Sequence, residues 1–425
     1  METLLFVASL LGGIAVGLPI AYAILASSLL VMAAMGEFDL QAVVQGAIAG
    51  VDSFVLMAVP FFILAGELMN AGGLSRRIVG MAMAFVGHLR GGMGYVAVIA
   101  AVILASLSGS AVADTAALGS ILIPMLRQAG YGLERSCGLI ASGGIIAPII
   151  PPSIGFLLYG VVGNVSITKL FLAGVFPGLL MGAALLLAWG WLSRSEEGMA
   201  RQRLSWGARL RALAEGGWAL MMPVIIIGGL KFGVFTPTES AVVAVFYALF
   251  VGVFIYRELD AKKIYHALLA ATKTTSVVLI LVATSAVASY VITISEIPAQ
   301  ITAILHPFMG SPTALVAVML LVTFFLGMAL EFIPVILILT PVFLPILAQG
   351  GIDPVYFGVV FMMTVSVGML MPPVGVVLNV ISAIGKLSLE RAVYGVLPFM
   401  VTEIILVILM ILFPALVMVP LRFLA

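Results

Sequence analysis

Charge is the scarcest property of this 425-residue chain: only 9% of its residues are Asp, Glu, Lys or Arg, and its net charge is +1. A soluble globular domain carries about 25% charged residues, so the composition excludes an ordinary soluble fold. The mean hydropathy is +1.30 and 63% of the residues are hydrophobic, which indicates a membrane protein surrounded by a lipid bilayer. We expect the lipid bilayer as its surroundings and no nucleic-acid partner.

Cysteine and histidine are almost missing. Cys137 stands alone, which excludes an intramolecular disulfide and a cysteine metal site within this chain, and the three histidines have no metal-ligand spacing. No HExxH, GxxxxGK[ST] or GxSxG motif occurs, so we expect neither ATP hydrolysis nor enzyme activity from this chain. The alternative of a membrane-embedded protease would need a base near Ser108 or Ser110, and the neighbouring sequence offers none.

Proline and glycine, by contrast, recur in register 221 residues apart. The matched positions are Pro124 with Pro345, Gln128 with Gln349, Gly130 with Gly351, Pro151-Pro152 with Pro372-Pro373, Gly174 with Gly395, and Pro177 with Pro398. Proline and glycine each meet a specific requirement of the backbone geometry. Their matches are therefore stronger evidence for an internal repeat than matches of Ile or Leu. Two copies of an apolar segment interrupted by Pro or Gly are typical of secondary transporters.

Apolar runs without any charged residue or histidine are long and continuous. They include Thr3–Gly36, Ser136–Thr168, Leu170–Ser193, Phe332–Ile352 and Pro354–Gly385. Each reaches the roughly 20 residues that cross a bilayer as a helix, and continuous runs favour helices over alternating strands. We therefore predict an all-α polytopic membrane protein with about eleven transmembrane helices and two re-entrant helical hairpins.

The pattern of prolines, glycines and charged residues divides the chain into four parts. These are an N-terminal transmembrane helix (1–40), a first repeat with hairpin and broken helix (41–192), a central section (193–261), and a second repeat with hairpin and broken helix (262–425). The central section opens with the arginine-rich stretch Arg194–Glu215, which the positive-inside rule places in the cytoplasm. We expect a surface helix over Met199–Ala214, an interfacial belt of the four tryptophans, and a helix-start role for Glu239 after the Thr236-Pro237-Thr238 turn.

Each repeat contains a candidate hairpin followed by a broken span. The hairpins are Leu107–Ala111 with Asp114 and Gly327–Pro334, and the broken spans are Pro148–Gly155 and Met371–Gly375. Consecutive prolines stop a helix and free carbonyl groups, which a membrane tolerates only where they line a cavity or bind an ion. Carbonyls and hydroxyls can surround a dehydrated cation, and a hairpin tip of small residues lets backbone N–H groups approach a carboxylate. The alternative is a pair of proline kinks that only shape packing.

The motifs together resemble a known family. The resemblance lies in Ser-Gly-Ser-Ala-Val-Ala-Asp (108–114), Ile-Ala-Pro-Ile-Ile-Pro-Pro-Ser (146–153), Phe-Thr-Pro-Thr-Glu-Ser (235–240) and Met-Pro-Pro-Val-Gly (371–375). Over nearly its full length the chain resembles the DctM-like large membrane subunit of a tripartite ATP-independent periplasmic (TRAP) transporter. Within that family it most resembles permeases linked to sugar-acid and keto-acid uptake.

The resemblance implies two inverted repeats and an elevator mechanism in the bacterial inner membrane. It implies sodium-coupled import of a small organic acid, such as a C4-dicarboxylate, keto acid or sugar acid, with Na⁺ as coupling ion and no cofactor. The implied partners are a small four-helix membrane subunit (DctQ-like) and a periplasmic substrate-binding protein (DctP-like). The alternative is a stand-alone Na⁺- or H⁺-coupled carboxylate carrier that needs no binding protein.

The hairpins and breaks supply the candidate site residues. The candidate substrate-binding residues are Ser108, Gly109, Ser110, Asp114, Ser153, Glu331, Pro334 and Val374. The candidate Na⁺ ligands are Ser108, Ser110, Pro148, Pro151, Pro152, Gly327, Met371, Pro372 and Gly375. Burying an ion in an apolar span costs at least about 2.5–3.5 kcal/mol, so Asp114 and Glu331 are candidates for contact with an ion, proton or substrate. A hydrogen bond that only stabilises the hairpin is the alternative for both.

Overall fold

The computed structural model describes residues 2–195, 203–372 and 374–424, and these ranges contain helices and no strand. The all-α prediction is therefore confirmed. The first fifth of the chain forms α1 (Glu2–Ala15), α2 (Ile20–Met35), α3 (Leu40–Val51), η1 (Phe54–Met57), α4 (Ala58–Ala71) and α5 (Leu74–Val86). The residues expected to form one N-terminal helix over 1–40 are instead divided into α1 and α2. The division falls where Gly17 has a φ of +90° and Pro19 precedes α2.

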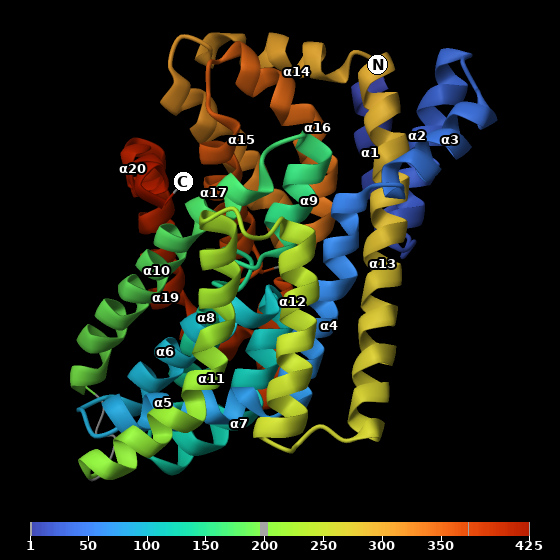
Figure 1. Cartoon of the computed structure of the whole chain (residues 1–425). Helices are drawn as coiled ribbons and strands as arrows, with labels where there is room; N and C mark the ends of the chain where they lie inside the picture. Colours follow the sequence, from blue (N-terminus) through green and yellow to red (C-terminus); the bar gives the residue numbers. More distant parts are fainter. Residues whose placement is uncertain (1, 196–202, 373, 425) are drawn as a thin grey trace.

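The elements of the two halves follow the 221-residue register. The first half has α6 (Gly92–Ser108), α7 (Ala111–Gln128), α8 (Leu133–Gly144), α9 (Ile154–Gly163), α10 (Ile167–Leu192) and η2 (Ser193–Ser195). The second has α15 (Pro312–Ala329), α16 (Phe332–Gln349), α17 (Pro354–Gly368), α18 (Val376–Gly385), α19 (Leu389–Leu412) and α20 (Ala415–Leu424). Both bounds of α7, for example, recur 221 residues later in α16. The α6–α7 hairpin lies in the lower part of Figure 1 and the α15–α16 hairpin in the upper part. Inversion of the whole repeats stays a prediction.

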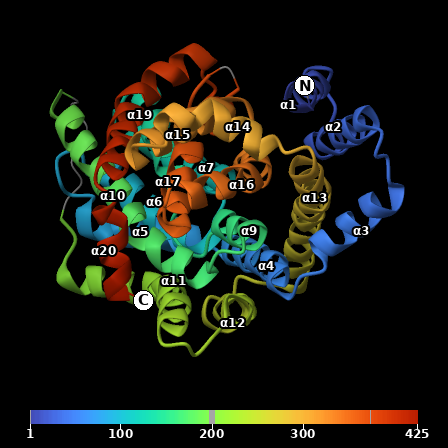
Figure 2. The same cartoon turned by 90° about the horizontal axis from the view of Figure 1, so that it is seen from above.

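Between these halves in the sequence lies a third group of helices, two of which, α11 and α13, are long. It consists of α11 (Trp206–Lys231), α12 (Pro237–Phe250), η3 (Val251–Ile255), α13 (Ala261–Ile294), α14 (Ile297–Leu305) and η4 (His306–Phe308). The 34-residue α13 runs along one side of the molecule and packs against α2, α3, α4 and α16 (Figures 1 and 2). At the other extreme, α17 is buried along its whole length from Val355 to Gly368 and packs against α10, α15, α16 and α19. The hairpins and broken helices thus surround a buried centre, with α13 at the periphery.

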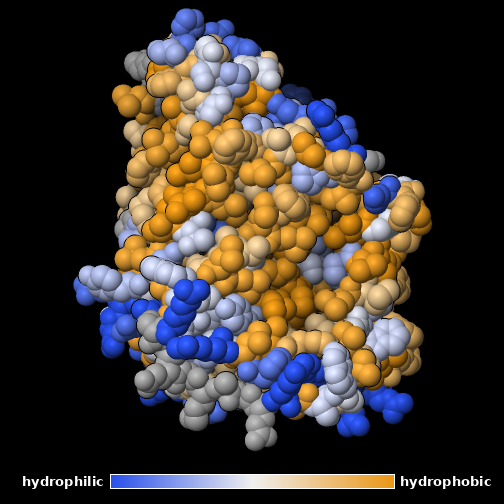
Figure 3. Space-filling model, turned by 90° about the vertical axis from the view of Figure 1, so that its left-hand side faces the viewer, coloured by the Kyte–Doolittle hydropathy of each residue, from blue (hydrophilic) through white to orange (hydrophobic). Residues whose placement is uncertain are grey.

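The surface has the character of a membrane protein. Among the described residues, eight helices are long and apolar enough to cross a bilayer. Figure 3 shows a broad hydrophobic surface between hydrophilic ends. The polytopic membrane fold is confirmed, while the count of eleven crossings stays a prediction.

The central section corrects two expectations and confirms one. Residues 199–202 of the expected surface helix lie outside the described ranges, and Trp206–Ala214 forms the first turns of the continuous α11, so a separate helix there is wrong. At Gly216, within this helix, α11 packs closely on α5, since an added Cβ would lie 2.9 Å from the Met81 Cβ. The tryptophan belt is wrong for Trp189, which is fully buried and donates from Nε1 to the Gly91 carbonyl at 2.8 Å. Glu239 does start a helix, since it forms a capping box with Thr236 at α12.

Candidate functional site

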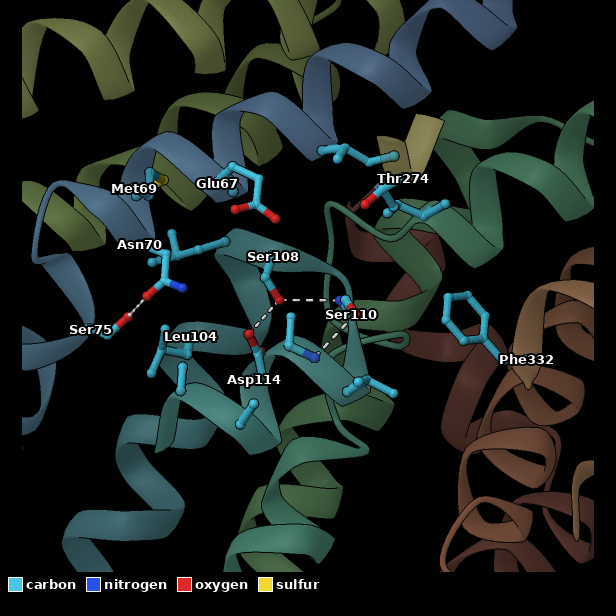
Figure 4. A pocket seen from close by; sticks show the side chains of 18 of the residues that line it. Glu67, Met69, Asn70, Ser75, Leu104, Ser108, Ser110, Asp114, Thr274 and Phe332 are labelled. Atoms are coloured by element: carbon cyan, nitrogen blue, oxygen red, sulfur yellow. Dashed lines mark hydrogen bonds between the residues drawn. The ribbon is translucent and has the colours of Figure 1, made fainter. Parts of the chain in front are cut away.

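The tip of the first hairpin is held by its own side chains. Gly109, between α6 and α7, has a φ of +63°, a conformation that favours glycine. Ser110 accepts from the Ala113 amide at 3.4 Å as the N-cap of α7, and Ser108 Oγ accepts from the Ser110 amide at 3.1 Å. Ser108 Oγ also donates to Asp114 Oδ1 (Figure 4). The Ser-Gly-Ser sequence therefore folds into a compact turn that faces the Asp114 carboxyl.

Asp114 is only half satisfied. Its side chain is 2% exposed, and among the described residues its Oδ2 has no hydrogen-bond partner. An unpaired carboxylate oxygen away from water is costly, so this oxygen calls for a proton, a cation or a donor from a ligand. The hydrogen bond from Ser108 means that Asp114 Oδ1 stabilises the hairpin. The other oxygen stays available for binding.

The first hairpin lies directly on the first broken helix. Residues 145–153 join α8 to α9 without regular α-helix and are all buried. Ser153 starts α9 by accepting from the Phe156 amide at 3.2 Å, and its hydroxyl donates to the Pro148 carbonyl. A Cβ atom at Gly109 would lie 2.7 Å from the Pro152 carbonyl oxygen. The tip and the break, predicted to form one half of an ion site, are thus in contact.

The second hairpin and break are also in contact, through different atoms. α15 ends at Ala329, Leu330 is extended, and Glu331 is the N-cap residue of α16. The amide of Gly375, the last residue of the break, donates to the Met328 carbonyl at 3.2 Å. Gly327 packs on the end of α17, since a Cβ at Gly368 would lie 2.9 Å from its carbonyl carbon. Pro373, the second proline of this motif, lies outside the described residues.

A cavity of about 320 Å³ lies where the first hairpin tip meets α4, α13 and the start of α16. Of the predicted site residues it is lined by Ser108, Ser110, Asp114 and Glu331. The structure does not bring Gly109, Pro148, Pro151, Pro152, Ser153, Gly327, Pro334, Met371, Pro372, Val374 or Gly375 to its walls. Gly109, Pro152 and Gly375 take part in the contacts between hairpin and break, whereas Pro334 is buried within α16 and Val374 is exposed. Their predicted roles as ligands stay predictions.

Sequence reasoning missed part of the lining. Glu67 and Asn70 of α4 and Thr274 of α13 add polar groups to the cavity wall (Figure 4). Glu67 carried a signal, because it is a charged residue in an apolar span. Asn70 and Thr274 carried none, since single polar residues at these positions do not mark a site until the helices are packed.

The first turns of two helices face this cavity. Val112 and Ala113 come from the start of α7, and Phe332 and Ile333 from the start of α16. Helix N-termini present unpaired N–H groups and the positive end of the helix dipole, which favour an anion. Asp114 and the two serine hydroxyls supply oxygen atoms of the kind that hard cations prefer. The lining can therefore accept an anion and a cation side by side.

An all-helical membrane chain with two hairpins against two broken helices has the architecture of a secondary transporter permease. The family model for the tripartite ATP-independent periplasmic transporter, DctM component, matches residues 7–416. The 2,3-diketo-L-gulonate TRAP transporter large permease of Escherichia coli K12 is 50% identical over 99% of both chains. The sialic acid TRAP transporter large permease of Vibrio cholerae is 35% identical over 95% of both. The chain belongs to the DctM family, the large permease component of TRAP transporters.

The fold is also that of a solved transporter. The crystal structure of the Alcanivorax borkumensis YdaH transporter covers 97% of this chain and 98% of its own with a TM-score of 0.67. Its sequence identity is 12%, so the likeness concerns the fold.

Proposed function

We propose that this chain is the permease of a sodium-coupled importer for a small organic acid delivered by a periplasmic binding protein. The observation that carries the proposal is the unpartnered Asp114 oxygen, at a hairpin tip that lines a 320 Å³ cavity reached by both hairpins. Membership of the DctM family supports the transport role. In the proposed assembly, a DctQ-like small membrane subunit and a DctP-like binding protein complete the system in the bacterial inner membrane.

The substrate we propose is a sugar acid or keto acid. The starts of α7 and α16 offer N–H groups to its carboxylate, and hydroxyl and amide side chains in the wall offer partners for further oxygen atoms. The relative from E. coli is named for 2,3-diketo-L-gulonate, which makes this compound the first one to test.

Na⁺ would bind at the first hairpin. Ser108 Oγ and Asp114 Oδ2 are the side-chain oxygens that we assign to it, with freed carbonyls of the 145–153 segment completing its shell. Both hairpins contact their breaks, so hairpins and broken helices can move as one body against α4 and α13. We propose that this elevator movement carries the cavity from one side of the membrane to the other.

Uptake into proteoliposomes tests the proposal. The chain and its small subunit are reconstituted, and uptake of labelled 2,3-diketo-L-gulonate is followed with and without an inward Na⁺ gradient and the loaded binding protein. We expect uptake only when the gradient and the binding protein are both present. Uptake without the binding protein would instead establish the stand-alone carrier, and uptake driven by a proton gradient alone would reject sodium coupling.

A further inference from the structure

A second hollow, of about 670 Å³, lies between α4 and α13, and most of its polar side chains are basic. Its polar lining consists of Glu67, Asn70, Lys262, Lys263, His266 and Lys273, and we call it the α4–α13 groove. Glu67 and Asn70 also line the candidate substrate cavity. The groove and the cavity therefore share one stretch of wall on α4, so an ion leaving the cavity along α4 would enter the groove.

The positive charge of the groove is not cancelled by its surroundings. Lys262 and Lys273 are exposed, and within the described ranges the side-chain ammonium group of neither has a hydrogen-bond or ion-pair partner. Lys263 Nζ donates to a backbone carbonyl, that of Glu258, at 2.7 Å. The carboxylate of Glu258 is itself paired with Arg77 at 2.7 Å.

One acidic side chain lines the groove, and another lies at its end. Glu67 is the only carboxylate among the lining residues, against three lysines. Asp260 caps α13 by accepting from the Lys263 amide at 2.7 Å and is not part of the lining. His266 Nδ1 contacts the Lys262 carbonyl at 2.6 Å. The groove therefore has a net positive potential that attracts anions.

Membrane topology does not account for the position of Lys273. Lys262 and Lys263 lie at the start of α13 and satisfy the positive-inside rule for a cytoplasmic end. Lys273 lies eleven residues beyond Lys262, about 16 Å farther along the helix axis. A lysine at that depth is costly in lipid but not in a water-filled groove. The positive-inside rule therefore explains Lys262 and Lys263. It does not explain Lys273, which we relate to an anion passing through the groove.

We propose that the α4–α13 groove is the cytoplasmic release path for the transported anion, with Lys262 and Lys273 as its attracting charges. An anion that leaves the cavity past Glu67 and Asn70 meets Lys273 first and Lys262 at the cytoplasmic end. The identity of the anion as the transported organic acid rests on the proposed function. The electrostatic character of the groove does not rest on it.

The test measures that character without transport. In the full chain with its small subunit, the buried Cys137 is replaced by alanine and a single reporter thiol is introduced as Asn70→Cys. The rate of its reaction with a negatively charged methanethiosulfonate is divided by the rate with a positively charged one. This ratio is then normalised to the same ratio for a free thiol in solution. We expect the anionic reagent to be favoured, and Lys262→Gln or Lys273→Gln to reduce the ratio about twofold or more each. Raising the ionic strength should reduce it as well.

Matched controls define the result that would overturn the proposal. Arg211→Gln removes a positive charge from the exposed face of α11, outside the groove lining, and should leave the ratio at Asn70→Cys unchanged. Ala214→Cys on α11 provides a reference thiol. The release path is rejected if Asn70→Cys reacts with neither reagent, or if both lysine variants keep the wild-type ratio. If the anionic reagent is favoured as expected but the organic acid is not taken up, the electrostatic character of the groove is supported and the proposed function is rejected.

Discussion

Asp114 has two oxygen atoms in two different situations. Oδ1 accepts the Ser108 hydroxyl and fixes the hairpin, whereas Oδ2 has no partner among the described residues. An asparagine at this position can still accept from Ser108 through its carbonyl oxygen, but it brings an uncharged donor to the place of Oδ2. The substitution therefore separates the structural part of Asp114 from its binding part.

We predict that Asp114→Asn keeps the folded protein but lowers uptake by about tenfold or more, because charge-assisted contacts are the strong ones. The measurement is initial uptake in proteoliposomes alongside the thermal unfolding midpoint in detergent. A variant that transports at the wild-type rate would reduce Asp114 to a hairpin-stabilising residue. A variant that loses both uptake and its folded state would show that the carboxylate is needed for the fold.

At this scale the sequence predicted the first hairpin well and the rest of the cavity poorly. The Ser-Gly-Ser turn and Asp114 lie close together in the chain, so local spacing could indicate their cooperation. Asn70 and Thr274 reach the cavity from α4 and α13, about 200 residues apart, and only the packing of those helices brings them together. Pro334 and Val374 belong to the second hairpin and the second broken span, yet neither lines the cavity.

At the scale of elements, α8 and α19 are in close backbone contact at two glycines. A Cβ atom at Gly138 of α8 would lie 2.0 Å from the Gly395 carbonyl oxygen of α19. Small residues allow membrane helices to approach in this way. Near the end of this contact, Arg391 of α19 pairs with Glu134 of α8 at 2.6 Å. The exposed pair contributes little, so the backbone contact holds these helices together.

We predict that Gly138→Ala destabilises the protein by about 2 kcal/mol or more, since the clash involves backbone that cannot turn away. The measurement is the thermal unfolding midpoint of the purified protein. Gly217→Ala is the control: it lies inside α11 with no atom within 4 Å of its added Cβ and should be neutral or stabilising. Equal midpoints for Gly138→Ala and the wild type would show that α8 and α19 separate at no cost.

Helix order was predictable because proline and glycine repeat in register, but helix continuity was not. Apolar composition cannot show that α1 and α2 are separate helices, or that α11 continues through Gly216 and Gly217. Packing decides these points: Gly216 lies against Met81 of α5, whereas Pro19 and Gly17 turn the chain between α1 and α2. Trp189 is a similar case, since Gly94 leaves space for its indole in the interior and Phe399 stacks on the ring.

In the whole molecule, each hairpin meets the break of its own half, and both hairpins reach one cavity. The two contacts are built differently, with Gly109 against Pro152 in the first and the Gly375 amide on Met328 in the second. The Ser-Gly-Ser turn is present only in the first. We therefore expect the two halves to contribute unequally, with Na⁺ bound at the first hairpin.

The most direct test of sodium coupling at this site is the external Na⁺ concentration that gives half-maximal uptake. It is measured in proteoliposomes for the wild type, for Ser108→Ala and for Ser120→Ala, whose hydroxyl bonds within α7 and does not line the cavity. The account predicts that Ser108→Ala raises this concentration about fivefold or more through loss of a ligand oxygen, while Ser120→Ala leaves it unchanged. The account would be contradicted if Ser108→Ala had the same half-maximal Na⁺ concentration as the wild type, or if uptake did not depend on Na⁺.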